Sequence, residues 1–276
     1  MMAQIIDRKR LKAEMRELLR SAQVSPRGMA AMYLLLSLSL STVAGFTGLA
    51  GGLLGTFASI LSSLIDVVLA AGFVMYCMAI RRGERAEYLT LFDGFSFAGK
   101  IILLTIITDL FIILWSTLFF IPGIIAAYRY RFALYNLYEN PGLTPMEALD
   151  MSKRQTLGYK SQLFLLDLSY VGWVILASLP LLLVESLLFE EMGLDGIYSI
   201  YTVAAPETLA SLPLWVWDII TGLWSAAVAV FYLPHYRCTE LGYFEIAKST
   251  SGVGEGAGPQ PDQGPWRNGP DDLGGY

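Results

Sequence analysis

Charged residues are scarce in this chain, and their scarcity follows a pattern. Only 16% of the 276 residues are Asp, Glu, Lys or Arg, against about a quarter in average soluble domains. Hydrophobic residues make up 55% of the chain and gather into long runs almost free of charge, separated by basic connectors. This pattern is typical of a polytopic membrane protein and excludes a single soluble enzyme domain for most of the chain. The net charge of −5 also argues against a nucleic-acid-binding protein.

Histidine and cysteine are nearly missing. The chain has one histidine, His235, and two cysteines, Cys77 and Cys238, without the CxxC spacing of a metal site. It also lacks the GxSxG and HExxH motifs and a glycine-rich loop that could hold phosphate. We therefore expect no catalytic residue, no cofactor and no metal site, and the protein is expected not to be an enzyme.

Five apolar runs are long enough to cross the hydrocarbon core, which takes about 20 residues of helix. A sixth segment, Gly123–Glu139, is rich in tyrosine and carries Arg129 and Arg131, so its composition alone does not decide whether it crosses. The five runs are Met29–Leu49, Phe57–Ile80, Ile101–Phe120, Leu163–Leu187 and Leu214–Leu233.

The positions of the 19 Lys and Arg residues decide the status of the sixth segment. Seven precede the first run, four lie between the second and third, three follow the sixth segment, and three lie in the C-terminal part. The connectors near residues 50–56 and 190–212 contain none. Because basic connectors stay in the cytoplasm, six spans place all of them inside and the other two connectors outside. The sequence predicts an all-α, six-span membrane protein with both termini cytoplasmic.

The six-span assignment has a further consequence, because a tight helical hairpin must join the third and fourth spans. Its turn is expected at Ile121-Pro122-Gly123, since proline lacks the N–H that continues a helix and glycine tolerates a sharp reversal.

Three regions follow from these patterns: a cytoplasmic N-terminal helix in residues 1–26, a membrane domain in residues 27–247, and a tail in residues 248–276 that is rich in Gly, Pro and Ser and is expected to be disordered. The N-terminal helix is amphipathic and basic, which favours the inner membrane surface, although a solvated helix or one that docks on a partner fits the same pattern. Its apolar residues, at helical spacing, are Leu11, Met15, Leu18 and Ala22.

A second amphipathic helix is expected between the fourth and fifth spans. Thr144, Pro145 and Glu147 form a capping box, which predicts a helix from Pro145 to about Leu157. It fits a helix lying along the inner surface of the membrane and, almost equally, an ordinary solvated connector.

Ionisable residues at membrane depth are the only candidates for a site. An unpaired charge in mid-bilayer costs a few kcal/mol, so such residues usually face the bundle interior and pair. The candidate polar site consists of Asp66, Asp109, Arg129 and Arg131. On a continuous hairpin Arg131 comes within reach of Asp109, whereas Arg129 points elsewhere. A ligand site or proton path is one interpretation; buried ion pairs that fix helix register, or arginines that reach the inner surface, are the other.

Several motifs between about residues 90 and 240 occur in a characteristic order. They include Leu91-Phe92-Asp93-Gly94-Phe95, Ile121-Pro122-Gly123 with the residues to Tyr128, Asn140-Pro141, Gly158-Tyr159-Lys160, and Leu168 to Trp173. In this order they resemble the bacterial membrane family known as domain of unknown function 975.

The resemblance implies a multi-span protein of the bacterial cytoplasmic membrane, more distantly similar to membrane domains attached to some glycerophosphodiester phosphodiesterases. It implies no established activity and no catalytic residues. Small polar residues are common in that family where this chain has Arg129 and Arg131, so the resemblance does not make the two arginines a general family site.

The leading hypothesis from the sequence is a non-enzymatic scaffold or accessory protein that binds membrane lipids or another membrane protein. The alternative is a transporter or export component that uses intramembrane Asp and Arg residues. A lipid-acting enzyme comes third, because fold-level analogy is a weak argument for function.

Overall fold

The computed structural model describes residues 4–49, 51–191 and 214–254, and these ranges contain helices and no strand, as the all-α prediction requires. Most of the expected acidic connector and residues 255–276 of the expected tail lie outside them. The elements are α1 (Arg8–Ser21), α2 (Pro26–Leu49), α3 (Gly52–Arg81), the 3-10 helix η1 (Tyr88–Phe97), α4 (Ala98–Leu118), α5 (Phe120–Arg129), α6 (Ala133–Glu139), α7 (Pro145–Gln155), α8 (Lys160–Leu168), α9 (Val171–Glu191) and α12 (Leu214–Ser251).

Several of these helices could cross a membrane. Four stretches in the described residues pass on length and composition: Pro26–Gly48, Gly52–Arg81, Tyr88–Leu118 and Val216–Ser251. A bent pair formed by α8 and the first part of α9, with 49° between the two helices, brings the number to five if the pair counts as one span. The protein is therefore built as a multi-pass membrane protein would be, while the sixth expected span is not confirmed.

The segment expected as the fourth span, Gly123–Glu139, is not one helix. Its first part belongs to α5, which ends at Arg129, and its second part forms α6 from Ala133. Between them the chain turns at residues 130–132, and α5 alone is 10 residues long, or about 15 Å at 1.5 Å per residue. The segment therefore consists of a short membrane-directed helix and a separate helix packed on other parts of the protein.

The reversal between α4 and α5 occurs at Phe119, not at the expected turn of residues 121–123, which corrects that prediction. Phe119 has the extended conformation that ends α4, and Pro122 lies in the first turn of α5, where its missing N–H has no helical partner to lose. Gly123 serves a different purpose from the one expected. A Cβ atom there would lie 2.0 Å from the Ser116 hydroxyl oxygen, so glycine allows α4 and α5 to approach closely.

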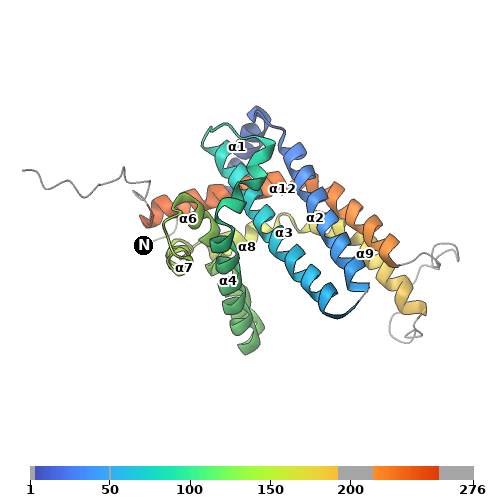
Figure 1. Ribbon diagram of the computed structural model, residues 1–276. Coiled ribbons are helices and arrows are strands. Elements are labelled where there is room, and N and C mark those ends of the chain that lie inside the picture. Colours follow the sequence, from blue (N-terminus) through green and yellow to red (C-terminus); the bar gives the residue numbers. More distant parts are fainter. Residues whose placement is uncertain (1–3, 50, 192–213, 255–276) are drawn as a thin grey trace, which may run out of the picture.

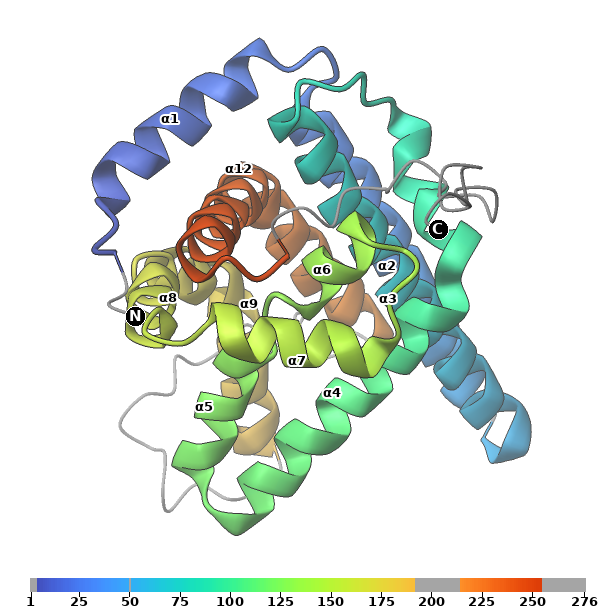
Figure 2. The ribbon, with the colours of Figure 1, turned by 90° about the vertical axis from the view of Figure 1, so that its left-hand side faces the viewer.

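The helices form three groups (Figure 1). One group is a bundle of α2, α3, α9 and the first half of α12. A second group, here called the cap, contains α1, α6, α7, α8 and the second half of α12, and lies at one end of that bundle. The α4–α5 hairpin leaves the cap separately and points away from α2 and α3 in both views (Figure 2).

The main hydrophobic core lies where the cap meets the bundle. It includes Phe73 and Tyr76 of α3, Phe132 of the turn after α5, and Phe244 of α12, all at most 1% exposed. Consequently the second half of α3, from Val68 onward, is buried within the protein, whereas the first half has many exposed apolar side chains.

Helix α1 covers part of this core. Leu11, Met15 and Leu19 are buried and belong to the same cluster as Leu241 of α12. The apolar face predicted for the N-terminal helix is thus covered by the protein's own helices. Within the cap, α1 lies beside α12 (Figure 2).

Helix α7 begins as its capping box predicted. The Thr144 hydroxyl accepts from the Glu147 N–H at 3.3 Å, and the Glu147 carboxylate accepts from the Thr144 N–H at 2.8 Å. Its buried side, which includes Ala148 and Leu149, packs against α6 and Leu104 of α4. This helix holds the base of the hairpin.

Candidate functional site

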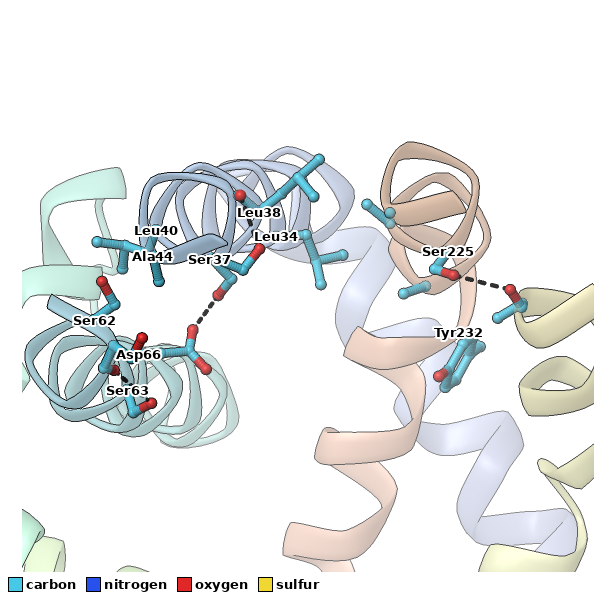
Figure 3. Close-up of a pocket in the computed structure, with 16 residues that line it drawn as sticks. Leu34, Ser37, Leu38, Leu40, Ala44, Ser62, Ser63, Asp66, Ser225 and Tyr232 are labelled. Atoms are coloured by element: carbon cyan, nitrogen blue, oxygen red, sulfur yellow. Dashed lines mark hydrogen bonds between the residues drawn. The ribbon is translucent and has the colours of Figure 1, made fainter. Parts of the chain in front are cut away.

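A cavity of about 550 Å³ lies between α2, α3, α9 and α12 (Figure 3). Its one carboxylate belongs to Asp66, which is half-buried, and most of its other polar groups are hydroxyls. The hydroxyl-bearing side chains in its lining are Ser37, Ser41, Ser59, Ser62, Ser63, Ser225 and Tyr232.

Helical spacing in the sequence brings these groups together. On α2 the lining residues Ser37, Ser41 and Ala44 recur every three or four residues and so share one face. On α3 the same spacing places Ser59, Ser62 or Ser63, and Asp66 on one face. The serine-bearing face of α2 therefore lies opposite that of α3, and α9 and α12 form the remaining wall of the cavity.

Hydrogen bonds organise the cavity wall. The Ser37 hydroxyl donates to the Asp66 carboxylate, which joins α2 to α3 (Figure 3). The hydroxyls of Ser59 and Ser63 donate to carbonyls one turn earlier in α3, at 3.0 and 2.9 Å, which leaves their lone pairs free to accept. On the opposite wall the Ser225 hydroxyl donates to the Ala177 carbonyl at 2.9 Å and joins α12 to α9. The lining consequently offers acceptors around a single carboxylate.

The charge of this cavity is uncompensated within the described residues, because no lining side chain is Lys, Arg or His and Asp66 has no ion-pair partner there. Holding a carboxylate at membrane depth is costly unless it is paired. The cavity therefore favours an occupant that donates hydrogen bonds and carries positive charge.

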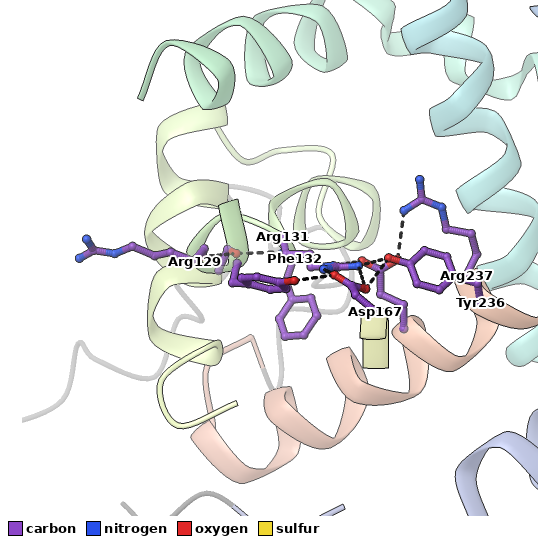
Figure 4. A network of polar contacts seen from close by, with 9 residues as sticks. Arg129, Arg131, Phe132, Asp167, Tyr236 and Arg237 are labelled. Atoms are coloured by element: carbon purple, nitrogen blue, oxygen red, sulfur yellow. Dashed lines mark hydrogen bonds and ion pairs between the residues drawn. The ribbon is translucent and has the colours of Figure 1, made fainter. Parts of the chain in front are cut away.

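A second polar cluster lies where the cap meets the membrane-directed helices (Figure 4). Arg131 donates to both carboxylate oxygens of Asp167, at 2.7 and 2.9 Å, and its Nε atom donates to Glu240 at 2.6 Å. Glu240 is buried and also accepts from Arg237 at 3.0 Å. Two acids and two arginines thus balance in this Arg131–Asp167 network.

Two tyrosines complete the network. The hydroxyl of Tyr128 donates to Asp167 at 2.7 Å, and that of Tyr236 donates to the other carboxylate oxygen at 2.8 Å. Every charged member of the cluster has a partner of opposite sign, so its geometry is that of a closed joint between the turn after α5, the end of α8, and α12. A fully paired cluster that is only partly exposed fixes how helices meet more than it offers a free charge to a ligand.

Two helices are interrupted close to the Arg131–Asp167 network. Helix α5 ends at Arg129, and α8 gives way to α9 at the 49° bend. The Arg129 carbonyl accepts from the Ser152 hydroxyl at 2.9 Å, and that same hydroxyl oxygen accepts from the Phe132 N–H at 3.0 Å. Side chains of α7 thereby satisfy the backbone groups that the break in the helix releases.

The four residues of the predicted polar site do not meet. Asp66 lies in the cavity and Arg131 in the network, whereas Asp109 is exposed on α4 and has no ion pair among the described residues. The Arg129 side chain points away from the network (Figure 4). The expected approach of Arg131 to Asp109 is wrong because it assumed a continuous helix, and the turn at residues 130–132 directs Arg131 toward α8 and α12 instead.

Sequence reasoning missed Glu240 and the serine cluster as parts of sites. Glu240 lies beyond the last expected span, in a stretch that resembled a cytoplasmic extension. The only local signal was its spacing of three residues from Arg237, with which it pairs. The serines were visible at helical spacing, but the same spacing also describes close helix packing.

A scan against protein families finds one similarity, which covers slightly less than half of the chain. Residues 118–250 match the model of the family described as protein of unknown function (DUF975). This part of the chain is similar to the DUF975 family. No curated protein and no solved structure matches the chain.

The region that matches DUF975 contains the whole Arg131–Asp167 network but only part of the Asp66 cavity. All members of the Arg131–Asp167 network lie within residues 118–250. Asp66 and the serines of α2 and α3 lie before that region, while Ser225 and Tyr232 of the opposite wall lie inside it. The DUF975 region therefore supplies one wall of the cavity, and the N-terminal helices supply the carboxylate.

Proposed function

We propose that the protein is a transport or export component of a bacterial cytoplasmic membrane that binds a small cationic solute at Asp66. The observation that carries this proposal is the hydroxyl-lined cavity, whose volume of about 550 Å³ is in the range of ligand pockets. A scaffold that acts only through its surface needs no polar cavity between its spanning helices. The structure thus favours the function that the sequence alone placed second.

The chemistry of the cavity narrows the class of solute. Asp66 supplies the only formal charge of the lining, and the serine hydroxyls supply acceptors and rotatable donors around it. A metal cation or a protonated amine is attracted by the carboxylate and can bind the hydroxyl oxygens, whereas an anion would be repelled by the carboxylate. Small primary amines combine a positive charge with three N–H donors, so they match this wall best.

The proposed topology has both termini in the cytoplasm and six membrane segments. Its support is the distribution of Lys and Arg, which places the cap and every basic connector on the same side. The α4–α5 hairpin begins and ends on the cap side of the membrane. The segments that follow it therefore have the same orientation whether or not the tip of the hairpin reaches the other aqueous phase. The Asp66 cavity then lies in the membrane, beyond the cap.

The test is solute flux into proteoliposomes, with radiolabelled methylammonium as the probe. We expect uptake by the unaltered protein and at least a tenfold loss in Asp66→Asn, which keeps the shape and the hydrogen bond from Ser37 but removes the charge. Asp109→Asn is the matched control, since Asp109 is also an acid on a membrane helix but lies exposed, outside the cavity. Both variants must elute as monodisperse protein in detergent.

Equal uptake by both variants would remove Asp66 from the function. Failure of methylammonium, of sodium ion and of neutral polar solutes alike to cross, or to raise the melting temperature of the unaltered protein, would overturn the transport proposal.

The second candidate function is the lipid- or protein-binding scaffold. It is favoured by α1, whose apolar face is used internally while exposed basic residues such as Lys9 and Arg10 remain on its surface. Recovery of one membrane-protein partner by crosslinking, together with no flux in the experiment above, would place this function first.

A further inference from the structure

A stripe of basic residues runs along α1. Arg8, Lys12, Arg16 and Arg20 recur every four residues and so lie on one side of the helix. The first two contact the protein itself. Arg8 donates to the Leu165 carbonyl at 2.6 Å, and Lys12 donates to the Ser169 hydroxyl at 2.7 Å. These bonds hold the stripe against the bend between α8 and α9.

The remaining two arginines of the stripe face a cavity of about 800 Å³, here called the basic pocket. Arg27, in the first turn of α2, adds a third guanidinium group. None of the three forms an ion pair with any described acid. The lining residues are Arg16, Leu19, Arg20, Ala22, Gln23, Ser25, Pro26, Arg27, Trp173, Phe231, Pro234 and His235, which include no Asp or Glu.

The acids of α1 lie on another side of the helix. Glu14 and Glu17 line a separate depression with Arg81 and Glu245. The acidic side chains of α1 thus lie on the side near the end of α3, and its arginines lie on the side near the starts of α2 and α9. The positive potential of the basic pocket is therefore not cancelled by its own helix.

Aromatic side chains form the membrane-directed wall of the basic pocket. Trp173 lies near the start of α9 and is 41% exposed, and Phe231 of α12 is 53% exposed. The Arg27 guanidinium lies 5.3 Å from the centre of the Phe231 ring. Because the apolar runs of α2 and α9 begin here, the pocket lies at the level of the lipid headgroups, where tryptophan is common.

We propose that the basic pocket binds an anionic phospholipid, with its phosphate among Arg16, Arg20 and Arg27 and its acyl chains along Trp173 and Phe231. Guanidinium groups match phosphate oxygens in charge and geometry, and basic pockets between membrane helices recognise such headgroups. Free phosphate shares the headgroup chemistry, but it would leave the aromatic wall unused. This lipid site is independent of solute transport, because it shares no lining residue with the Asp66 cavity.

The experiment is native mass spectrometry of the full chain released from detergent, titrated with phosphatidylglycerol and, separately, with phosphatidylcholine. We expect phosphatidylglycerol to be retained and phosphatidylcholine to be lost. Arg16→Gln, Arg20→Gln and Arg27→Gln combined should weaken phosphatidylglycerol binding on the order of a hundredfold, since each basic residue near an anionic surface contributes about a fivefold factor. Glutamine preserves helix propensity at these exposed positions.

The matched control is Lys9→Gln with Arg10→Gln, which removes two charges from the same helix outside the basic pocket. An equal loss in this control would mean general attraction to the helix and would overturn the site. Displacement of the lipid by millimolar inorganic phosphate would show an anion site alone and would equally overturn the lipid assignment.

A second measurement uses the unaltered protein. Photoactivatable phosphatidylglycerol, with the reactive group near the headgroup end of its acyl chain, should crosslink to Trp173 or Phe231. Crosslinks confined to the α4–α5 hairpin would contradict the proposal.

Discussion

Arg131 and Asp167, 36 residues apart in the sequence, form a two-point ion pair with N–O distances of 2.7 and 2.9 Å. The pair joins the turn after α5 to the last turn of α8. Because Arg131 also reaches buried Glu240 on α12, one side chain joins three segments: the turn after α5, α8 and the second half of α12.

Replacing Arg131 with Met should destabilise the protein strongly. The substitution leaves Asp167 without its arginine and Glu240 with Arg237 alone. Loss of one partner from a buried pair costs about 3–5 kcal/mol, and the lower end is expected here because the Asp167 side chain is 31% exposed. Arg129→Met is the matched control, because no ion pair holds its side chain among the described residues. Thermal unfolding in detergent should show a large drop in melting temperature for the first variant and little change for the second. Equal melting temperatures would mean that the network does not hold the helices.

Gly72 marks a close approach between α3 and η1. A Cβ atom there would lie 1.9 Å from the Leu91 carbonyl oxygen, which belongs to the backbone and cannot rotate away. Gly72→Ala should therefore cost roughly 3 kcal/mol, at the upper end of typical overpacking. Gly45→Ala, where nothing lies within 4 Å, should be neutral or stabilising by up to about 1 kcal/mol. Melting temperatures of the two variants check this, and a stable Gly72→Ala protein would contradict the crossing.

The tip of the α4–α5 hairpin should stay inside the membrane. Phe119 and Phe120 are 70% and 76% exposed, and their neighbours Leu118 and Ile121 are equally apolar, so a tip in water would expose four large hydrophobic side chains. Phe119→Cys should then resist a water-soluble maleimide added to either side, whereas Gly48→Cys, near the end of α2, should react from outside.

Background labelling in that experiment should be low, because Cys77 and Cys238 are both buried. For the same reason, these native cysteines cannot report the topology themselves. Reaction of the Phe119→Cys variant from outside would show that the hairpin crosses completely.

The capping box of α7 gives a pH dependence. The N–H and hydroxyl of Thr144 hold the pKa of Glu147 below its ordinary value of 4.5. A lowered carboxyl pKa contributes stability that is present above the unfolded-state pKa and is lost as pH falls through the folded-state pKa. The protection factors of the first-turn amides of α7, which correct the exchange rate for its intrinsic pH dependence, should therefore fall below about pH 4.5, and Thr144→Ala should show faster exchange already at neutral pH. An unchanged exchange rate in Thr144→Ala would contradict the cap.

The sequence predicted features that depend on local composition. Apolar runs located α2, α3, α4, α9 and the first half of α12, and the residues around Thr144 located the start of α7. Both patterns are local because membrane insertion and helix capping act on neighbouring residues.

Features that depend on contacts between distant segments were not predictable. The direction of the Arg131 side chain depends on the turn at residues 130–132, which no local sequence signal predicts. That turn is stable because the Ser152 hydroxyl, from another helix, pairs with its backbone groups. The extent of α12 was likewise hidden, since Tyr243 and Phe244 are buried only through packing on the cap. The cavity around Asp66 required knowing that two serine-bearing faces look toward each other.

Helix α12 runs without interruption for 38 residues, about 57 Å, from the membrane bundle into the cap. Ser225 on the wall of the Asp66 cavity and Glu240 in the network thus belong to the same helix and lie about 22 Å apart along its axis. Between them Pro234 removes one backbone hydrogen bond and makes the point of least stiffness. A bend at Pro234 would therefore change the angle between the part of α12 that lines the cavity and the part that carries Glu240, so the two sites meet at one flexible position.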